Sequence, residues 1–479
     1  MAATRKFFAL FLAILFLLAA VETPRATAAD DPPEAKQVDS IFTDLTKPGS
    51  PGCALAVARD GRTVYAKGYG LANIEENVPI TPQTVFDIGS TSKQFTAASV
   101  LLLEKQGKLS VNDDVRKYIP ELPDYGRNIT ILHLLNHTSG LRDYLTLFEL
   151  AGVNIDNVTT DDDALNLIIR QKALNFDPGS EWLYSNTGFF LLSIIVKRVS
   201  GKSLREFAAG NIFVPLQMTA TSYRDNHTEL VPNRALAYDP KEKSGGFSLD
   251  VSYFEQTGDG AVHTSVSDLL KWDDNFYSAQ IGGTEFLAEL QQTGKLNDGK
   301  SLTYAKGLSV ESYRGLRTVR HGGSWGGYRA ELLRFPDQHF SVVCLCNLAS
   351  ARPSRRANQV ADVFLSSQMG SIKPAATPAD ADESPQKPKQ TLALTADQLK
   401  QFEGNYWSDE LQITYRLAIE NGALVLRVRN LPPRKLTAMP DNEFTIADLG
   451  VSLKITVSGD KIGFLLGAGR THMRFEKRP

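Results

Sequence analysis

The chain has 479 residues, 42% of them hydrophobic, and its 52 basic and 54 acidic side chains leave a formal charge of −2. This length and composition suffice for large buried cores and predict two or three globular domains. Because basic residues are not in excess, the composition argues against nucleic acid as a partner.

The N-terminus has the pattern of a secretory signal peptide. Arg5 and Lys6 precede an apolar run over residues 7–21, and small residues follow at 26–29. The run is shorter than the ~18 to 20 residues that span a bilayer. We therefore expect residues 1–29 to be a cleaved signal peptide, the protein to be secreted or periplasmic, and no stable membrane insertion after cleavage. An uncleaved anchor is the weaker alternative.

Strands are predicted at both ends of the region that follows. Residues 52–70 show two β segments joined by a turn at 59–61. An antiparallel meander is predicted over residues 316–347, and helices and loops dominate between 81 and 290. The pattern predicts an α+β fold, with one sheet assembled from both ends of the domain and a helical insertion beside it.

Helix ends are marked within the central region. Gly107 and Gly201 each close an apolar helical segment, as glycine commonly does after a helix C-terminus. Ser265 and Asp268 have the spacing of a capping box ahead of a third helix.

The C-terminal part of the chain differs in composition. Residues 371–390 are rich in Pro, Ala, Asp and Lys and predict a solvated linker. The short strands and turns that follow predict a small barrel or sandwich, without a nucleophile, metal cluster or phosphate loop. We expect a first domain over 30–368, a linker over 369–391 and a β domain over 392–479.

Three cysteines are too few and too poorly spaced for a zinc site. Cys344 and Cys346 share one face of a predicted strand. An oxidising compartment permits a disulfide, and Cys53, on another predicted strand, is then expected near one of these two cysteines. Three small buried hydrophobic residues are the more frequent alternative.

Ser90 and Lys93 stand three residues apart at the start of an apolar helix, IGSTSKQFTAASVLLL (88–103). Side chains at this spacing are neighbours on a helix, so the amine can take the proton that a serine must lose to become a nucleophile. A helix N-cap is the alternative for Ser90, and the local sequence leaves both open. Lys93, on a helix that is apolar nearly all round, needs a partner or a cavity, which favours a functional role.

Tyr184 and Asn186 alternate with Ser185 ahead of another apolar helix. Residues two apart in an extended chain face the same way. The phenol can relay the Ser90 proton to a leaving group, and the amide can hold a substrate carbonyl and orient Lys93. Taken alone, the segment is better explained as a turn with a half-buried tyrosine and Asn186 as a cap.

A third segment, RHGGSWGGYRAELLRF (320–335), surrounds His321, Ser324 and Trp325 with glycines at the junction of two strands. Glycine inside a strand often marks the close approach of a ligand to the backbone. The backbone N–H groups of Ser324 and Ser90 can form an oxyanion hole. An ordinary glycine-rich turn explains this segment equally well by itself.

Together the three motifs, in this order, resemble those of the serine β-lactamase and penicillin-binding-protein superfamily, in its class C β-lactamase-related branch. The resemblance covers residues 38–365 and includes LLNHTSGL (134–141) and GDGAVHTSVSDLLKW (258–272). It implies the fold of that superfamily: an antiparallel sheet flanked by helices, plus a helical lobe, with the site at the edge of the sheet.

The resemblance implies a role for each matching residue. Ser90 is the acylated nucleophile, and Lys93 and Tyr184 share the general acid and base roles. Asn186 binds the acyl amide or carbonyl of the substrate, and His321 stands where true β-lactamases have lysine. The other substrate-binding residues expected are Gly323, Ser324, Trp325 and Arg329, with the Ser324 N–H in the oxyanion hole. No metal or cofactor is implied.

One departure bears on the substrate. His321-Gly322-Gly323 replaces Lys-Thr-Gly, and a neutral imidazole anchors a β-lactam carboxylate less firmly than an ammonium. Hydrolysis of an ester or amide bond in a small-molecule or peptide substrate, including D-amino-acid peptides, is therefore favoured. The alternatives are an acylated sensor or peptidoglycan-binding protein that turns over poorly, and a true class C-like β-lactamase. Sequence does not predict the oligomeric state.

The resemblance extends to two further features. The C-terminal β domain resembles lipocalin-like domains appended to D-aminopeptidase-type relatives, where they can overhang the active site. In the superfamily fold the first and last strands are neighbours, which favours pairing of Cys53 with Cys344 or Cys346.

Overall fold

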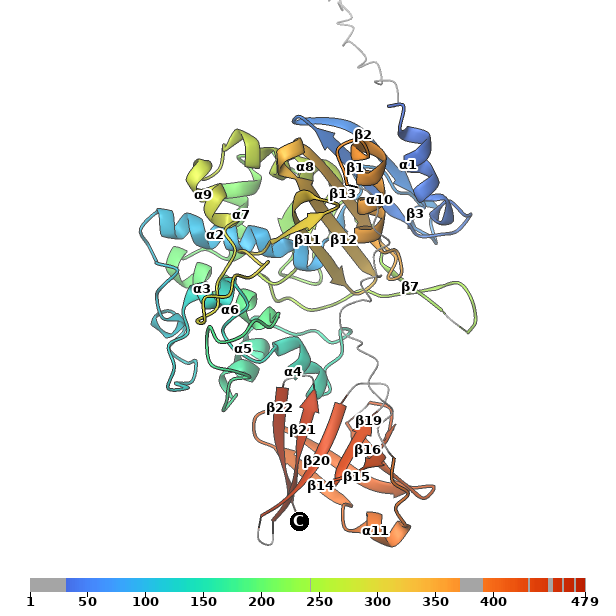
Figure 1. Ribbon diagram of the computed structural model, residues 1–479. Helices are drawn as coiled ribbons and strands as arrows, with labels where there is room; N and C mark the ends of the chain where they lie inside the picture. The colour runs from blue at the N-terminus through green and yellow to red at the C-terminus, as the bar shows by residue number, and fades with distance from the viewer. Residues whose placement is uncertain are drawn as a thin grey trace, which may run out of the picture.

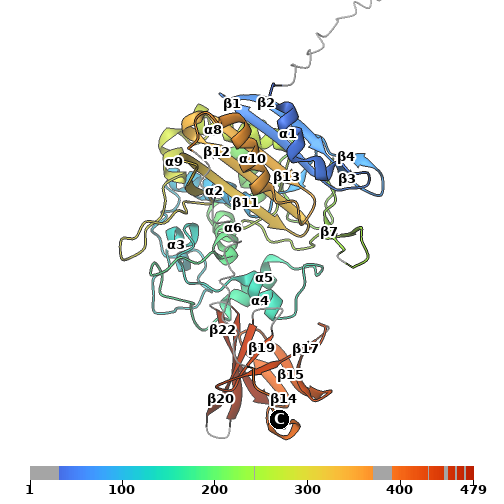
Figure 2. The ribbon, with the colours of Figure 1, turned by 45° about the vertical axis from the view of Figure 1, so that its right-hand side comes forward.

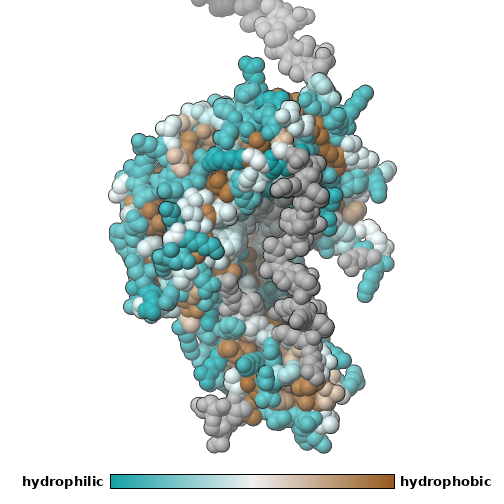
Figure 3. All heavy atoms as spheres, in the orientation of Figure 1, coloured by the Kyte–Doolittle hydropathy of each residue, from teal (hydrophilic) through white to brown (hydrophobic). Residues whose placement is uncertain are grey.

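The computed structural model describes residues 32–241, 243–370, 391–429, 431–446, 451–458, 461–468 and 471–478. The predicted signal peptide and nearly all of the predicted linker lie outside this range. Within the described residues, no helix combines the length and apolar character needed to cross a bilayer. The face drawn in Figure 3 is largely hydrophilic, with hydrophobic residues scattered over it.

A six-stranded antiparallel sheet organises the first domain (Figure 1), and it is built from both ends of the domain as predicted. The hairpin and the meander form over the predicted segments, and β13 pairs with β1 along its whole length. In sheet order the strands are β10 (Ser309–Tyr313), β11 (Leu316–Trp325), β12 (Tyr328–Phe335), β13 (Phe340–Cys346), β1 (Cys53–Arg59) and β2 (Arg62–Tyr69).

The sheet separates two hydrophobic cores. Alternate residues of β1 enter different cores: Leu55 and Val57 face one, whereas Ala54 and Ala56 face the other. Because both faces are covered, β1 is buried along nearly its whole length and lacks a polar alternation. Figure 2 shows α1 (Ala35–Ile41) and α10 (Pro353–Leu365) on one face, and α2 (Lys93–Lys105) and α8 (Val266–Ser278) lie on the other side.

The central region is a helical lobe with short two- and three-stranded pieces. Gly201 ends α6 in a left-handed conformation, as the sequence predicts. The remaining helices are α3 (Ile131–Leu135), α4 (Tyr144–Leu150), α5 (Asp161–Ile169), α6 (Asn186–Ser200), α7 (Leu204–Ala208) and α9 (Gly283–Leu290). The short strands are β3 (Leu71–Asn73), β4 (Val78–Pro79), β5 (Phe86–Asp87), β6 (Ser222–Tyr223), β7 (Tyr238–Pro240), β8 (Phe247–Leu249) and β9 (Val262–Thr264).

Only half of the predicted capping box forms. The Ser265 hydroxyl accepts the backbone N–H of Asp268 at 3.2 Å and so caps α8. The Asp268 carboxylate turns away, because it accepts the N–H of Ala220 at 2.7 Å and the hydroxyl of Thr221 at 2.9 Å. A tertiary contact thus replaces the local one that the spacing predicts.

The register of β1 and β13 pairs Cys53 with Cys346, and these residues form a disulfide. Cys344 is free and buried, with its sulfur 3.7 Å from that of Cys346. The interpretation of three unpaired hydrophobic residues is therefore wrong, and the alternative left open between Cys344 and Cys346 is resolved in favour of Cys346.

The C-terminal domain is a nearly closed β-barrel of nine antiparallel strands, with α11 (Ala396–Lys400) before it. The two edge strands, β17 and β18, are separated by a single residue. Alternate residues of β15 are buried, as expected for a strand with one face inside a barrel. The strands are β14 (Gly404–Ser408), β15 (Ile413–Glu420), β16 (Ala423–Val428), β17 (Arg434–Lys435), β18 (Thr437–Met439), β19 (Glu443–Ile446), β20 (Val451–Ser458), β21 (Lys461–Ala468) and β22 (Thr471–Arg478).

Candidate active site

Ser90 lies in a short 3-10 helix, η2 (Gly89–Ser92), that leads directly into α2. No side chain caps either helix, so the capping interpretation of Ser90 is not what the structure shows. The Ser90 hydroxyl instead accepts a hydrogen bond from Lys93 Nζ at 3.1 Å. The spacing of three residues therefore brings the alcohol and the amine together, as helix geometry predicts.

Lys93 is completely buried at the start of α2. Besides the Ser90 hydroxyl, its ammonium group donates to Asn186 Oδ1 at 2.9 Å and to the backbone carbonyl of Asp259 at 2.7 Å. Burial lowers the pKa of Lys93 to about 8, and the negative charges of Asp259 and Asp143 limit the fall. A lysine in this state can lose its proton near neutral pH and act as a base.

Tyr184 and Asn186 both face this lysine, as their alternation about the extended residue Ser185 predicts. Asn186 is the first residue of α6, and Ser185 holds the extended cap position before it without a side-chain cap. The Tyr184 ring lies over Lys93 Nζ, 4.8 Å from its centroid. The buried Tyr184 hydroxyl interacts with the Ser90 hydroxyl, but their geometry falls short of a well-formed hydrogen bond. Burial raises the pKa of this phenol well above its ordinary value.

The glycines of the third motif allow the turn that carries Ser90 to pack against β11. A Cβ on Gly323 would lie 1.8 Å from the carbonyl oxygen of Ile88, and a Cβ on Gly89 would lie 2.8 Å from the backbone nitrogen of Ser324. Gly323 therefore accommodates the chain's own backbone, in addition to lining a groove that contains Ser90. This close contact sets the Ser324 backbone beside the residue that precedes Ser90.

His321 is buried and neutral. Its Nδ1 donates to the carbonyl of Gly322 at 2.6 Å, so its Nε2 accepts from the Tyr304 hydroxyl at 2.9 Å. Burial, together with the charge of Lys93, lowers the pKa of His321 to about 4. The imidazole therefore offers no positive charge to a substrate at neutral pH.

Two hollows meet at Ser90. One is a cavity of about 140 Å³ whose lining includes Trp325, Phe254 and the carboxyl-bearing residues Asp87 and Asp259. The other is an open groove of about 1100 Å³ that His321, Ser324 and Arg329 help to line. Every predicted site residue except Lys93 lines one of these hollows. Lys93 contacts Ser90, which lines both. None of the described barrel residues lines either hollow, so this part of the barrel does not overhang the site.

Several residues around Lys93 were not identified from the sequence as site residues. The Tyr144 hydroxyl donates to Asp259 Oδ2 at 3.0 Å, and the Asp143 carboxylate accepts the N–H of Asn186. Burial raises the pKa of Asp259 to about 6, against the pull of Lys93. The sequence offered one signal for these residues. Asp143 stands at the N-cap of α4, a position at which aspartate is a preferred residue. Asp259 lies in the segment 258–272 that carries part of the resemblance, although no role was assigned to it, and Tyr144 carries no local signal.

His137 is a further buried residue that the sequence did not single out. Its Nδ1 accepts the N–H of Ser185 at 3.2 Å, and its carbonyl accepts the N–H of Leu183 at 3.0 Å. Both bonds flank Tyr184, whose ring lies 4.2 Å from the imidazole between centroids. His137 thus holds in place the segment that carries the phenol.

Comparisons with known proteins agree with this geometry. The Beta-lactamase family matches residues 38–365. Penicillin-binding protein 4* of Bacillus subtilis (strain 168) is 27% identical over 446 residues, which cover 89% of this chain and 94% of that protein. A D-aminopeptidase of Gluconobacter oxydans (strain 621H) is 30% identical over 302 residues, which cover 63% of this chain and 56% of the aminopeptidase.

Among solved structures, the octameric penicillin-binding protein homologue from Pyrococcus abyssi superposes with a TM-score of 0.62. The match covers 93% of this chain and 100% of that one, at 24% sequence identity. At this identity the likeness concerns the fold, and it extends over both the hydrolase-like domain and the C-terminal domain.

Proposed function

Because this chain belongs to the β-lactamase family of serine hydrolases, we propose that it cleaves an ester or amide bond through an acyl-enzyme on Ser90. The observation that carries the proposal is the convergence of three groups. Lys93 Nζ lies 3.1 Å from the Ser90 hydroxyl and 2.9 Å from the Asn186 amide oxygen, with the Tyr184 phenol beside the same hydroxyl.

In the first half of the reaction, Ser90 Oγ attacks the carbonyl carbon of the substrate. Its proton passes to neutral Lys93, directly or through the Tyr184 hydroxyl. The N–H groups of Ser90 and Ser324 stabilise the oxyanion, and the Asn186 amide holds the acyl part. The bond to the leaving group then breaks, and that group receives the proton, which leaves an ester on Ser90.

In the second half, a water molecule attacks the ester carbonyl and gives a proton to the same base. The ester bond breaks, the acid departs and the Ser90 hydroxyl recovers its proton. Tyr184 serves as a relay rather than as the resting base, because burial keeps its phenol protonated at neutral pH.

The preferred substrate is a D-amino-acid amide or short D-peptide. The similarity to a D-aminopeptidase supports this class. The cavity beside Ser90 supports it too, since Asp259 places a carboxyl where a substrate amine can lie. Neutral His321 supplies no fixed cation for a β-lactam carboxylate, which disfavours β-lactamase activity.

The chain is exported before it acts, and cleavage follows residue 29. The leader pattern of residues 1–29 supports export, and so does the Cys53–Cys346 disulfide, which forms in oxidising compartments. N-terminal sequencing of the mature protein should begin at Asp30; a mature protein that begins at Met1 would contradict cleavage of the leader.

Labelling and turnover test the reaction. A fluorophosphonate probe should label the mature protein but not Ser90→Ala. The Ser99→Ala variant is the matched control, because Ser99 is a buried serine on the same helix whose hydroxyl donates only to Phe95 O. D-amino-acid amides, p-nitrophenyl esters and a chromogenic cephalosporin then rank the substrates. Equal labelling of Ser90→Ala would refute the nucleophile, and labelling without turnover of any substrate would indicate an acylated sensor instead.

A further inference from the structure

The barrel and the helical lobe are joined by a buried ion pair. Arg142 Nη1 lies 2.6 Å from Glu410 Oε1, and the two side chains are only 6% and 8% exposed. The same arginine donates to Gln171 Oε1 at 2.8 Å and to the carbonyl of His472 at 2.9 Å. Charges removed from water persist only when fixed partners surround them, so Arg142 is held in one position by the barrel.

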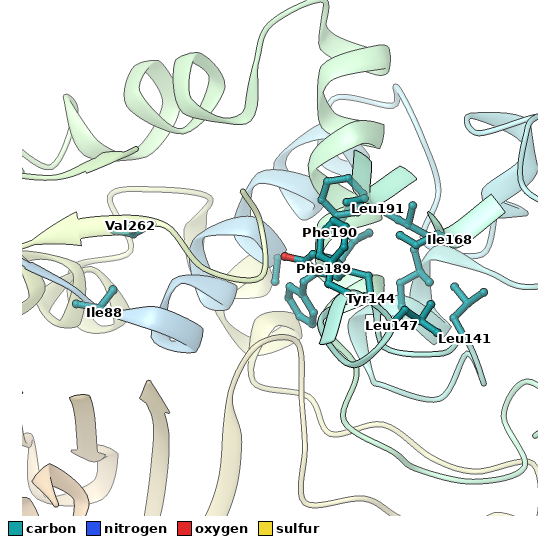
Figure 4. Close-up of a cluster of buried hydrophobic side chains, with 14 of the residues drawn as sticks. Ile88, Leu141, Tyr144, Leu147, Ile168, Phe189, Phe190, Leu191 and Val262 are labelled. Carbon is teal, nitrogen blue, oxygen red and sulfur yellow. The ribbon is translucent and has the colours of Figure 1, made fainter. Parts of the chain in front are cut away.

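The barrel also holds the far end of the helix that follows Arg142. The Tyr415 hydroxyl of β15 donates to the carbonyl of Leu150, the last residue of α4, at 2.7 Å. Both ribbon views show the barrel against this helix (Figures 1 and 2). In Figure 4, Tyr144 and Leu147 of α4 lie against Phe189 and Phe190 of α6. The barrel therefore fixes α4 at its two ends, while α6 packs along its side.

The backbone at Arg142 leads directly to the groups around Lys93. Its carbonyl accepts the Thr187 hydroxyl at 2.7 Å, and that hydroxyl accepts the N–H of Tyr144 at 2.8 Å. The next two side chains continue the chain of contacts. The Asp143 carboxylate accepts the N–H of Asn186, and the Tyr144 hydroxyl donates to the carboxylate of Asp259. Asn186 and Asp259 are the residues that accept hydrogen bonds from Lys93 besides Ser90.

We propose that Arg142 is a positioning residue through which the C-terminal barrel, by way of Glu410, sets the geometry around the catalytic lysine. The barrel thereby supports catalysis without touching the substrate. This inference rests on the proposed role of Lys93 as the base. It assigns the barrel a role that differs from a lid over the active site.

The interface offers a matched pair of substitutions. Glu410→Gln removes the charge that holds Arg142. Lys172→Gln removes a second ion pair between the same surfaces, Lys172 to Asp409 at 3.3 Å, whose side chains are 66% and 60% exposed. The side chain of Lys172 has no connection to residues 142–144, so its loss should leave the kinetics unchanged.

With p-nitrophenyl acetate as the probe, Glu410→Gln should lower kcat about 10- to 100-fold with little change in KM, because misplaced catalytic groups slow the chemical step more than they weaken binding. The pH dependence of fluorophosphonate labelling should shift as well. Asp143 and Asp259 raise the pKa of Lys93, so their displacement lowers that pKa and moves the acid limb to lower pH.

A merely structural defect would reduce labelling equally at every pH, as would partial unfolding. Such a uniform loss, or kinetics equal to those of Lys172→Gln, would overturn the inference. If Glu410→Gln fails to fold by circular dichroism, Arg142→Lys carries the same test, since it keeps the cation but loses the forked contact to Glu410 and His472. Ser90→Ala separates the two proposals: its continued labelling would refute the proposed function, whereas its loss of labelling beside a normal Glu410→Gln would refute only this inference.

Discussion

Lys93 is the residue on which the proposed chemistry depends, and its surroundings shift its pKa in opposite directions. Burial disfavours the ammonium, whereas Asp259, Asp143 and three hydrogen-bond acceptors favour it. The balance leaves its pKa at about 8, well below the usual value for lysine. Most of the Lys93 side chains are therefore charged at neutral pH, and the fraction with a neutral amine increases as the pH rises.

The pH profile follows from this balance. We predict that kcat/KM for p-nitrophenyl acetate is low in acid and rises with pH to a plateau above about 8, since only the neutral amine accepts the Ser90 proton. Steady-state rates across the range, corrected with Ser90→Ala, measure it. Lys306→Met is the control, because Lys306 is also a buried lysine, but its ammonium group donates to the carbonyl of Glu289 and not to Ser90. A rate that does not change with pH would contradict Lys93 as the base.

Removal of the Tyr184 hydroxyl tests the relay. We predict that Tyr184→Phe lowers kcat about 100-fold, within the range typical of a lost proton-transfer group, while the ring over Lys93 remains. Single-turnover labelling and steady-state kinetics measure the loss. Tyr277→Phe removes another buried phenol hydroxyl, which faces Arg334 and Ser341 instead of Ser90, and should leave kcat unchanged. Equal kinetics for the two variants would exclude Tyr184 from proton transfer.

Residues that contact within one helical turn could be predicted from the sequence, and residues joined only by the tertiary fold could not. The Ser90 and Lys93 pair follows from helix geometry alone. The carbonyl of Asp259, by contrast, reaches Lys93 across 166 residues of sequence separation. Tyr144 could not be predicted as a site residue for the same reason, because no spacing rule links it to residue 259.

At the scale of elements, periodicity and turn residues predicted the main strands and the ends of the apolar helices. The errors lie where a side chain found a partner outside its own element. Asp268 binds Ala220 and Thr221 rather than completing its capping box, and Asn186 begins α6 instead of preceding it. Local preference decides such positions only when no tertiary contact competes.

The contact between η2 and β11 gives an element-scale prediction. Gly323→Ala should lower the rate of fluorophosphonate labelling by on the order of 100-fold, because its Cβ would meet the backbone oxygen of Ile88 at 1.8 Å and displace the nucleophile turn. Gly322→Ala is the neighbouring control, since its Cβ would meet the end of the Glu331 side chain at 3.2 Å. Similar labelling of the two variants would show that the close packing does not position Ser90.

For the whole molecule, the sequence predicted a sheet assembled from both chain ends and a separate β domain, because strand patterns frame the helical region and resume after a proline-rich stretch. The position of the barrel against the helical lobe could not be predicted. It depends on Arg142 and Glu410, which lie 268 residues apart and carry no motif. Charged pairs between domains can be identified only from the structure, because the two residues are distant in the sequence.

The disulfide gives the last prediction, since it joins the two ends of the hydrolase domain across 293 residues. Closing so long a loop restricts the unfolded chain, so Cys53→Ala should lower the free energy of unfolding by on the order of 3–5 kcal/mol. Cys344→Ala is the matched control: it also removes a buried sulfur from the same core, but it leaves the disulfide intact.

Thermal unfolding, with and without dithiothreitol, distinguishes these variants. Reductant should lower the melting temperature of the wild type and of Cys344→Ala to that of Cys53→Ala. The kcat of folded Cys53→Ala should stay unchanged, because the disulfide lies in the core beneath α1 and α10, whereas α2 packs in the other core. Equal melting of the Cys53→Ala and Cys344→Ala variants without reductant would show that the first and last strands are held together by pairing and packing alone.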